Sequence, residues 1–215
     1  MNMSPSLHHA KYELGNILKH PEQLLLILAT PISLLVLFPQ TSSIFQFTLG
    51  ACALSSSFVS ISINTAFARR YGMLKYMAVT PLGLSGLVVG QTLVGAALFC
   101  LQIPISILAA SYSKAEIAIS LQTISLIPAL LLVFSLLSFL FASVLSAEKV
   151  LAFANLVFIF ILITGFKAIE TSWGLVHPLS AFAQSDQNYL QALFTLLIYL
   201  ATVSVLLRKF FKWLD

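Results

Sequence analysis

Three observations predict an all-α integral membrane protein in which six transmembrane helices form one domain, residues 1–215. Only 8% of the 215 residues are charged, whereas a soluble domain carries about 25%. Hydrophobic residues make up 59% of the chain, and the mean hydropathy is +0.99. The apolar residues gather into six runs, each near the roughly 20 residues that cross a bilayer. This composition excludes a soluble enzyme, a nucleic-acid-binding domain and a self-contained ATPase module.

The first element is expected to be an amphipathic helix over about residues 4–20. Ser4 followed by Pro5 is a typical helix start, with the serine as cap and the proline at the first helical position. Apolar residues such as Leu7 and Leu14 then recur at helical spacing, and polar residues occupy the other side. Such a helix lies along a membrane surface. Pro21 is expected to end it.

Six apolar runs follow and are assigned as spans. They cover about residues 23–38, 44–67, 84–110, 121–146, 150–166 and 189–207. Glu148 and Lys149 are interpreted as a tight turn between the fourth and fifth spans, and residues 167–188 form a longer connection. Pro31, Pro104 and Pro128 lie inside spans, where membrane helices tolerate the kinks that proline introduces.

The basic residues predict the topology. If the amino terminus is inside, only Lys114 and Lys167 fall on the outer side. The inner side then holds all the others: Lys11, Lys19, Arg69, Arg70, Lys75, Lys149, Arg208, Lys209 and Lys212. Because cytoplasmic loops are enriched in lysine and arginine, we expect both termini in the cytoplasm.

The sequence contains almost none of the residue patterns that enzymes use for catalysis. No span holds Asp, Glu, Lys, Arg or His at depth, which argues against an ion-driven carrier. The four histidines lack the spacing of a metal site or a catalytic triad. The glycine run at 83–92 lacks the lysine of a phosphate-binding loop. We therefore expect no enzyme, no metal and no cofactor in this chain, so that energy from ATP would come from a partner.

Weakly polar residues do occur inside the spans. Ser57, Ser60 and Asn64 share one face of the second span. Small and polar residues on one face commonly mark a contact between membrane helices, and the same face is also a candidate lining for a substrate pathway. Gln91, Gln102 and Asn155 are candidates for hydrogen bonds between helices.

The segment after the second span is the most informative part of the chain. It reads RRYGMLKYMAVTPL over residues 69–82. Its three cations place it in the cytoplasm, and its apolar residues at helical spacing predict a short amphipathic helix that ends at Thr80-Pro81. From these residues alone, it is either an anchor on anionic lipid or a docking element.

This segment resembles the cytoplasmic segment of ABC type-2 transporter permeases, most of all the bacterial drug-export permeases. In that family a charged pair, a glycine, a leucine-lysine step and a threonine-proline-leucine form the coupling helix, which docks into an ATPase subunit. The resemblance places this role on Arg69, Arg70, Gly72, Leu74, Lys75, Thr80, Pro81 and Leu82.

The resemblance has further implications. It makes the helix at 4–20 an elbow helix, and it places short re-entrant helices at 167–188, where His177-Pro178-Leu179 matches a proline-containing turn. It implies a permease subunit of a bacterial plasma-membrane exporter, paired as a homodimer or heterodimer and bound to two ATPase subunits that hold ATP and Mg. The apolar and hydroxyl-bearing spans favour an amphipathic or lipid-like substrate. The alternatives are a haem-export permease of cytochrome maturation and a non-transporting membrane scaffold or assembly factor.

Overall fold

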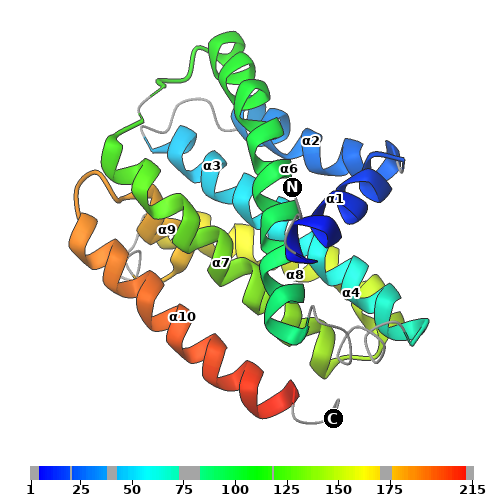
Figure 1. The fold of residues 1–215 in the computed structure, drawn as a ribbon. Coiled ribbons are helices and arrows are strands. Elements are labelled where there is room, and N and C mark those ends of the chain that lie inside the picture. The colour runs from blue at the N-terminus through cyan, green and yellow to red at the C-terminus, as the bar shows by residue number, and fades with distance from the viewer. Residues whose placement is uncertain are drawn as a thin grey trace.

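The fold comes from a computed structural model, which describes residues 5–19, 21–37, 43–72, 83–117, 119–169 and 176–211. All regular structure within these ranges is helical (Figure 1), which confirms the all-α prediction. The helices are α1 (Pro5–Leu18), α2 (Pro21–Leu37), α3 (Ile44–Leu54), η1 (Ser55–Val59), α4 (Ser60–Arg70), α6 (Gly83–Ser113), α7 (Leu121–Val144), α8 (Ala147–Ile169), α9 (Pro178–Ala183) and α10 (Tyr189–Phe211).

Five helices in the described part of the chain are long and apolar enough to cross a membrane. One is the continuous helix Ile44–Arg70, built from α3, η1 and α4, and the other four lie in α6, α7, α8 and α10. This confirms the prediction of a multi-pass membrane protein. Helix α2, which falls on the first predicted span, has a shorter apolar stretch, Ile27–Val36.

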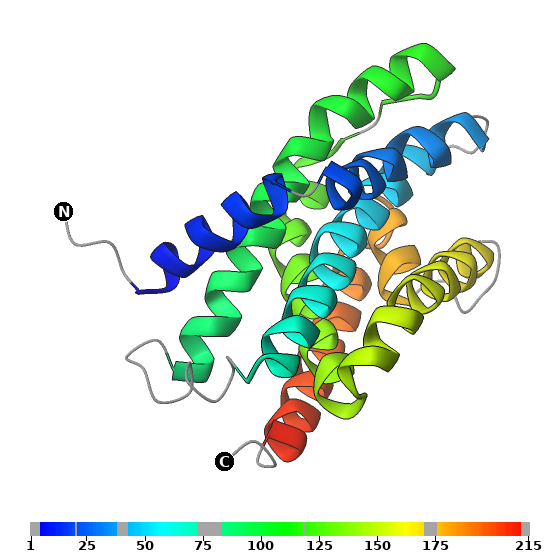
Figure 2. The ribbon, with the colours of Figure 1, turned by 90° about the vertical axis from the view of Figure 1, so that its right-hand side faces the viewer.

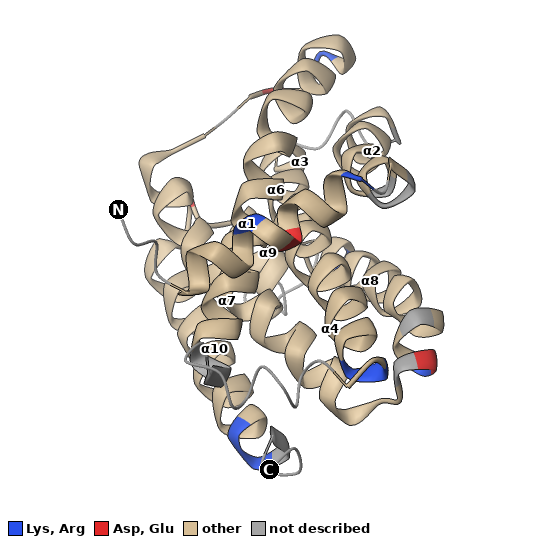
Figure 3. Ribbon diagram, turned by 45° about the vertical axis from the view of Figure 1, so that its right-hand side comes forward, with Lys and Arg blue, Asp and Glu red and all other residues tan. Residues whose placement is uncertain are grey.

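Charged residues lie near the helix ends and on α1, as Figure 3 shows. One end of the bundle, here named the basic end, carries Arg69, Arg70, Lys149, Arg208 and Lys209. The prediction that Glu148 and Lys149 form a turn is wrong, because both lie in the first turn of α8. An acidic residue such as Glu148 suits that place, since helix N-termini attract negative charge.

The helix Ile44–Arg70 forms the centre of the bundle and packs against α2, α6, α7, α8 and α9. Every residue of α3 and η1 is buried. Its middle, Ser55–Val59, is a π-helical turn, which the sequence prediction of a regular span did not anticipate. Ser55 and Ser56 donate their hydroxyls back to the carbonyls of Cys52 and Ala53 (3.0 and 3.2 Å). Such back-bonding distorts a helix.

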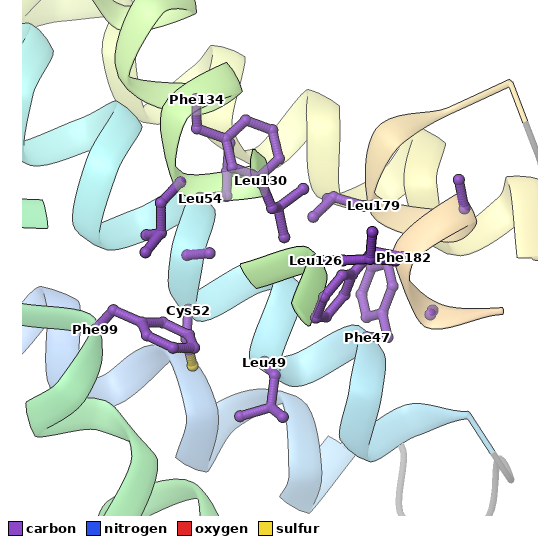
Figure 4. Packing of buried hydrophobic residues seen from close by; sticks show 14 of the residues in the cluster. Phe47, Leu49, Cys52, Leu54, Phe99, Leu126, Leu130, Phe134, Leu179 and Phe182 are labelled. Atoms are coloured by element: carbon purple, nitrogen blue, oxygen red, sulfur yellow. The ribbon is translucent and has the colours of Figure 1, made fainter. Parts of the chain in front are cut away.

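The main hydrophobic core lies between the central helix and its neighbours, as Figure 4 shows. Phe47 and Leu54 from the central helix meet Phe134 of α7 and Phe182 of α9 in one cluster. Helix α10 packs along α7 on the outside of this core, visible in Figure 1. The apolar residues therefore hold α3, α7 and α9 as one unit, against which the other helices are placed.

The end of the bundle that carries α9, here named the α9 end, is held by polar contacts. Asp186, just after α9, accepts hydrogen bonds from Gln46 of α3 and from Ser120 and Thr123 at the start of α7. Burial raises the pKa of the Asp186 carboxyl, but these three hydrogen bonds lower it by more, so the net pKa lies below its usual value. This carboxylate joins three segments that are far apart in the sequence.

Candidate functional site

Arg69 is the first residue of the predicted coupling set, and its side chain is used inside the fold. Its Nη1 donates to the carbonyls of Ala142, Ser143 and Leu145, at 2.9 to 3.1 Å. These carbonyls belong to the last turn of α7 and to Leu145, the residue that caps it, where the oxygens have no partner within the helix. A cation at a helix C-terminus is also favoured by the helix dipole. Arg69 therefore caps α7 and fastens it to α4.

The next residues turn outward at the basic end. Arg70 is exposed, and α4 ends with hydrogen bonds from Tyr71 N to Phe67 O and from Gly72 N to Arg69 O, both 3.0 Å. Gly72 has a φ of +70°, a conformation that glycine adopts without strain at the end of a helix. The remaining predicted coupling residues, Leu74, Lys75, Thr80, Pro81 and Leu82, lie outside the described residues.

Two residues of the predicted face of the second span, Ser57 and Ser60, are buried in the bundle, and the third, Asn64, is half-buried. Ser57 faces α6 at very close range, because a Cβ on Gly95 would lie 2.7 Å from its Oγ. Among the described residues, Ser57 Oγ, Ser60 Oγ and Asn64 Nδ2 have no hydrogen-bond partner. An unpaired buried polar group costs about 1–3 kcal/mol, so this face is not arranged for maximal stability.

A groove lies on another side of the central helix, between α2 and α8. Figure 2 shows α8 on the side of the bundle away from α6. The first part of the groove is a cavity of about 260 Å³ lined by Ile27, Ala29, Thr30 and Ser33 of α2, Ser55 and Val59 of η1, and Asn155, Phe158 and Ile159 of α8. Its floor is the π-helical turn. The cavity combines apolar walls with three hydroxyls and one amide.

The second part of the groove is almost wholly apolar. It is a cavity of about 300 Å³ lined by Leu34, Phe47, Ile159, Leu162, Ile163, Phe166 and Lys167. Ile159 lines both cavities, so they are neighbours along α8. The groove thus runs from a weakly polar part in the middle of α8 to an apolar part at the α9 end, where Lys167 is the cation.

Asn155 is an unusual residue for its position. It lies in the middle of the apolar helix α8 and is exposed. The predicted hydrogen bond between helices is not found for it among the described residues, and its amide lines the groove instead. Polar side chains in membrane helices are found facing partners or cavities rather than lipid tails. Asn155 is therefore the polar group that marks the groove most clearly.

Gln102 of α6 supports the groove from behind. Its Nε2 donates to Ile27 O at 2.6 Å and to Ser55 Oγ at 2.9 Å. The carbonyl of Ile27 needs this donor, because the residue four positions later is Pro31, which has no N–H. Gln102 thus confirms the predicted hydrogen bond between helices. It fixes one residue in each of two walls of the groove.

His177 fixes the far end of α8. Its Nδ1 accepts from Leu179 N at 3.3 Å and so caps α9, while Nε2 lies 3.3 Å from Thr164 Oγ1 of α8. Because Thr164 Oγ1 donates to Phe160 O (2.8 Å), the imidazole is the donor in the second contact. Burial lowers the pKa of His177 to about 4, so the ring is neutral at pH 7.

Within the described ranges, no three His, Cys, Asp or Glu side chains come together in a group that could hold a metal ion. No family model, curated protein or solved structure matches the chain. The features of the molecule that bear on function are the groove, the polar residues of the central helix and the basic end. Sequence analysis named Gln102 and Asn155 only as candidates for hydrogen bonds. It missed Thr30, Ser33 and Ser55, which look like ordinary span residues until α2, η1 and α8 are brought together.

Proposed function

We propose that the chain is the permease subunit of an ATP-binding-cassette exporter, and that it moves an amphipathic or lipid-like substrate. It would sit in a bacterial plasma membrane with six spans, α2 included, and with the basic end and both termini in the cytoplasm. A separate ATPase subunit would bind residues 69–82 and drive alternating access. The observation that carries the proposal is the groove between α2 and α8, which grades from weakly polar to apolar.

The lengths of two helices support the coupling role. The central helix has 27 residues and α6 has 31, which correspond to about 40 and 46 Å, whereas the hydrocarbon core is about 30 Å thick. Both helices reach the basic end, and residues 71–82 connect them. If α1 lies at the membrane surface, its contact with Gly90 leaves residues 91–113 of α6, about 34 Å, to cross the bilayer. Residues 71–82 would then lie beyond the lipid.

The groove supports the substrate class. It offers hydroxyl and amide groups beside apolar walls and no acidic side chain. A soluble cation would be desolvated there without compensation, because no carboxylate lines the groove. A molecule with an apolar body and a few hydrogen-bonding groups could pack its body against the apolar walls and hydrogen-bond to the hydroxyl and amide groups.

The proposal is tested by purifying the full chain from its native membrane and identifying what comes with it. We expect a stoichiometric ATPase subunit, which Arg70→Glu should release and Arg208→Glu should retain, since both arginines are exposed cations at the basic end. Arg69 is unsuitable for this test, because it caps α7. Recovery of the chain alone, or of unrelated enzymes, would contradict the transporter assignment and favour the scaffold.

The groove is tested separately by filling it. Ile159→Trp places a large side chain between the two cavities, whereas Ile198→Trp places the same side chain on the exposed surface of α10. We expect the first variant to lose substrate-stimulated ATPase activity in the assembled transporter and the second to keep it. Equal activity of both variants would exclude the groove as the substrate route. Stimulation by haem but not by amphipathic drugs or lipids would select the haem-export alternative.

A further inference from the structure

The outward face of α1 forms a basic hollow that plays no part in the fold. It is a cavity of about 350 Å³ lined by His8, Lys11, Tyr12, Gly15, Asn16 and Lys19. Residues three and four apart are neighbours on a helix, so Lys11, Gly15 and Lys19 stand in one row. Tyr12 and Asn16 stand beside this row. Two ammonium groups, a phenol and an amide therefore surround one glycine.

Gly15 has no packing reason to be a glycine. A Cβ at this position would meet no atom within 4 Å, and a glycine inside a helix makes the helix less stable than an alanine would. Its effect is to leave the helix backbone uncovered between the two lysines. The space above Gly15 can hold a ligand group that a side chain at position 15 would exclude.

The rest of α1 shows which environment surrounds this hollow. Leu7 and Leu18 are 44% and 51% exposed, and by helical spacing they flank the lysine row on the side of Lys11. The opposite half of α1, with Ala10 and Ile17, is buried against its neighbours. An apolar band thus runs alongside a cationic band, which is the pattern of a helix lying at the boundary between acyl chains and headgroups.

Helix α1 is also held firmly in this orientation. It packs along α6, where Gln91 Nε2 donates to His9 Nε2 at 3.3 Å. Gly90 makes this contact possible, since a Cβ there would lie 2.9 Å from the His9 ring. Glu13, the acidic residue of α1, is half-buried on the side away from the lysine row. The cationic face is therefore prearranged and has no acidic residue among those that line it.

We propose that the basic hollow of α1 binds the phosphate headgroup of an anionic phospholipid. Lys11 and Lys19 pair with the phosphate, Tyr12 and Asn16 hydrogen-bond the headgroup, and Gly15 lets it rest against the helix. The acyl chains lie along Leu7 and Leu18, which is why a lipid fits better than a dissolved anion. The proposal does not depend on the proposed transport activity, since it concerns only the described contacts of α1.

The test is native mass spectrometry of the full-length protein in detergent, titrated with phosphatidylglycerol or with phosphatidylcholine. We expect the anionic lipid to bind about tenfold more tightly, because Lys11 and Lys19 attract a negatively charged headgroup. Lys11→Gln combined with Lys19→Gln should remove this preference. Gly15→Leu should also reduce binding, because it fills the hollow without breaking the helix.

The controls separate a site from general charge attraction. Lys209→Gln removes an exposed cation from α10 and should leave lipid binding unchanged, and circular dichroism should show that every variant keeps its helices. Equal binding of both lipids, or equal loss in the Lys209→Gln variant, would overturn the proposal. Complete displacement of the lipid by an equal concentration of inorganic phosphate would overturn the lipid assignment and identify a free-phosphate site.

Discussion

The central helix has two unlike sides. Toward α6 and α7, here named the closed side, the backbones come close together, with Gly95 against Ser57 and Ser62 in contact with Ser138 (2.9 Å). Toward α2 and α8, here named the open side, the same helix leaves a groove. Small residues allow the backbones to approach closely on the closed side. The open side is shaped by Pro31, by the π-helical turn and by Gln102. Close packing and an open groove therefore place different demands on one helix.

The largest expected effect comes from breaking the closed side. Gly95→Leu would drive a side chain into Ser57, whose Oγ, Cα and Cβ would all lie within 3.4 Å of a Cβ at position 95. Overpacking of this kind costs about 3 kcal/mol. Thermal unfolding in detergent should show the loss. Gly15→Leu, which meets open space, is the matched control, and equal stability of the two variants would contradict the close packing described.

The second effect comes from the open side. Gln102→Leu leaves the Ile27 carbonyl without a donor and should cost about 1–2 kcal/mol. Pro31→Ala restores an N–H four residues after Ile27, so the same Gln102→Leu change should cost clearly less in that background. Unfolding measurements on the four proteins of this double-mutant cycle isolate the coupling. Strictly additive costs would show that Gln102 does not serve the proline-freed carbonyl.

A smaller effect is expected on acidification. Burial lowers the pKa of His177 to about 4, below the roughly 6.5 of an exposed histidine. The unfolded chain therefore binds the proton first, and stability falls as the pH drops from about 6.5 toward 4. The loss should be smaller than that of Gln102→Leu, because the ring is partly exposed and solvent screens its charge.

This pH effect is checked by unfolding the protein across that range. His177→Gln should flatten the curve, since its side chain does not titrate. His9 contributes with the same sign, because burial lowers its pKa too, and His9→Gln measures that share. If a variant that carries both His177→Gln and His9→Gln keeps the same dependence of stability on pH, the assignment of the effect to these two histidines is contradicted. Asp186, with its lowered pKa, would act only at lower pH, near and below about 4.

The smallest expected effect comes from removing the hydrogen bonds of Ser138 on the closed side. Ser138 donates to Phe58 O at 3.2 Å and therefore accepts from Ser62. Ser138→Ala removes both bonds and should cost about 0.6 kcal/mol for each of them, the average for such bonds between membrane helices. Ser143→Ala is the control, because among the described residues that hydroxyl bonds only the carbonyl of Leu140, in its own helix. A loss as large as that of Gly95→Leu would show that hydrogen bonds, and not close packing, hold this side together.

The sequence predicted the helices well because each one depends on nearby residues. Apolar runs gave the long helices α6, α7, α8 and α10, and Ser4-Pro5 gave the start of α1. The π-helical turn at Ser55–Val59 was missed, since a run of three serines does not by itself reveal how their hydroxyls bond. The site was predicted only in part: Gln102 was recognised as a polar residue that needs a partner, but neither Ile27 nor Ser55 was identified as that partner.

The sequence by itself determined the membrane class, the helical elements and the placement of charge near helix ends and on α1, because these follow from hydropathy and local spacing. Only the tertiary structure decided that Arg69 caps α7, that Gln102 serves a carbonyl freed by Pro31, and that the groove lies between α2 and α8. The partners in these contacts are 47 to 76 residues apart. Local sequence patterns carry no record of such pairs, since packing of the whole bundle brings them together.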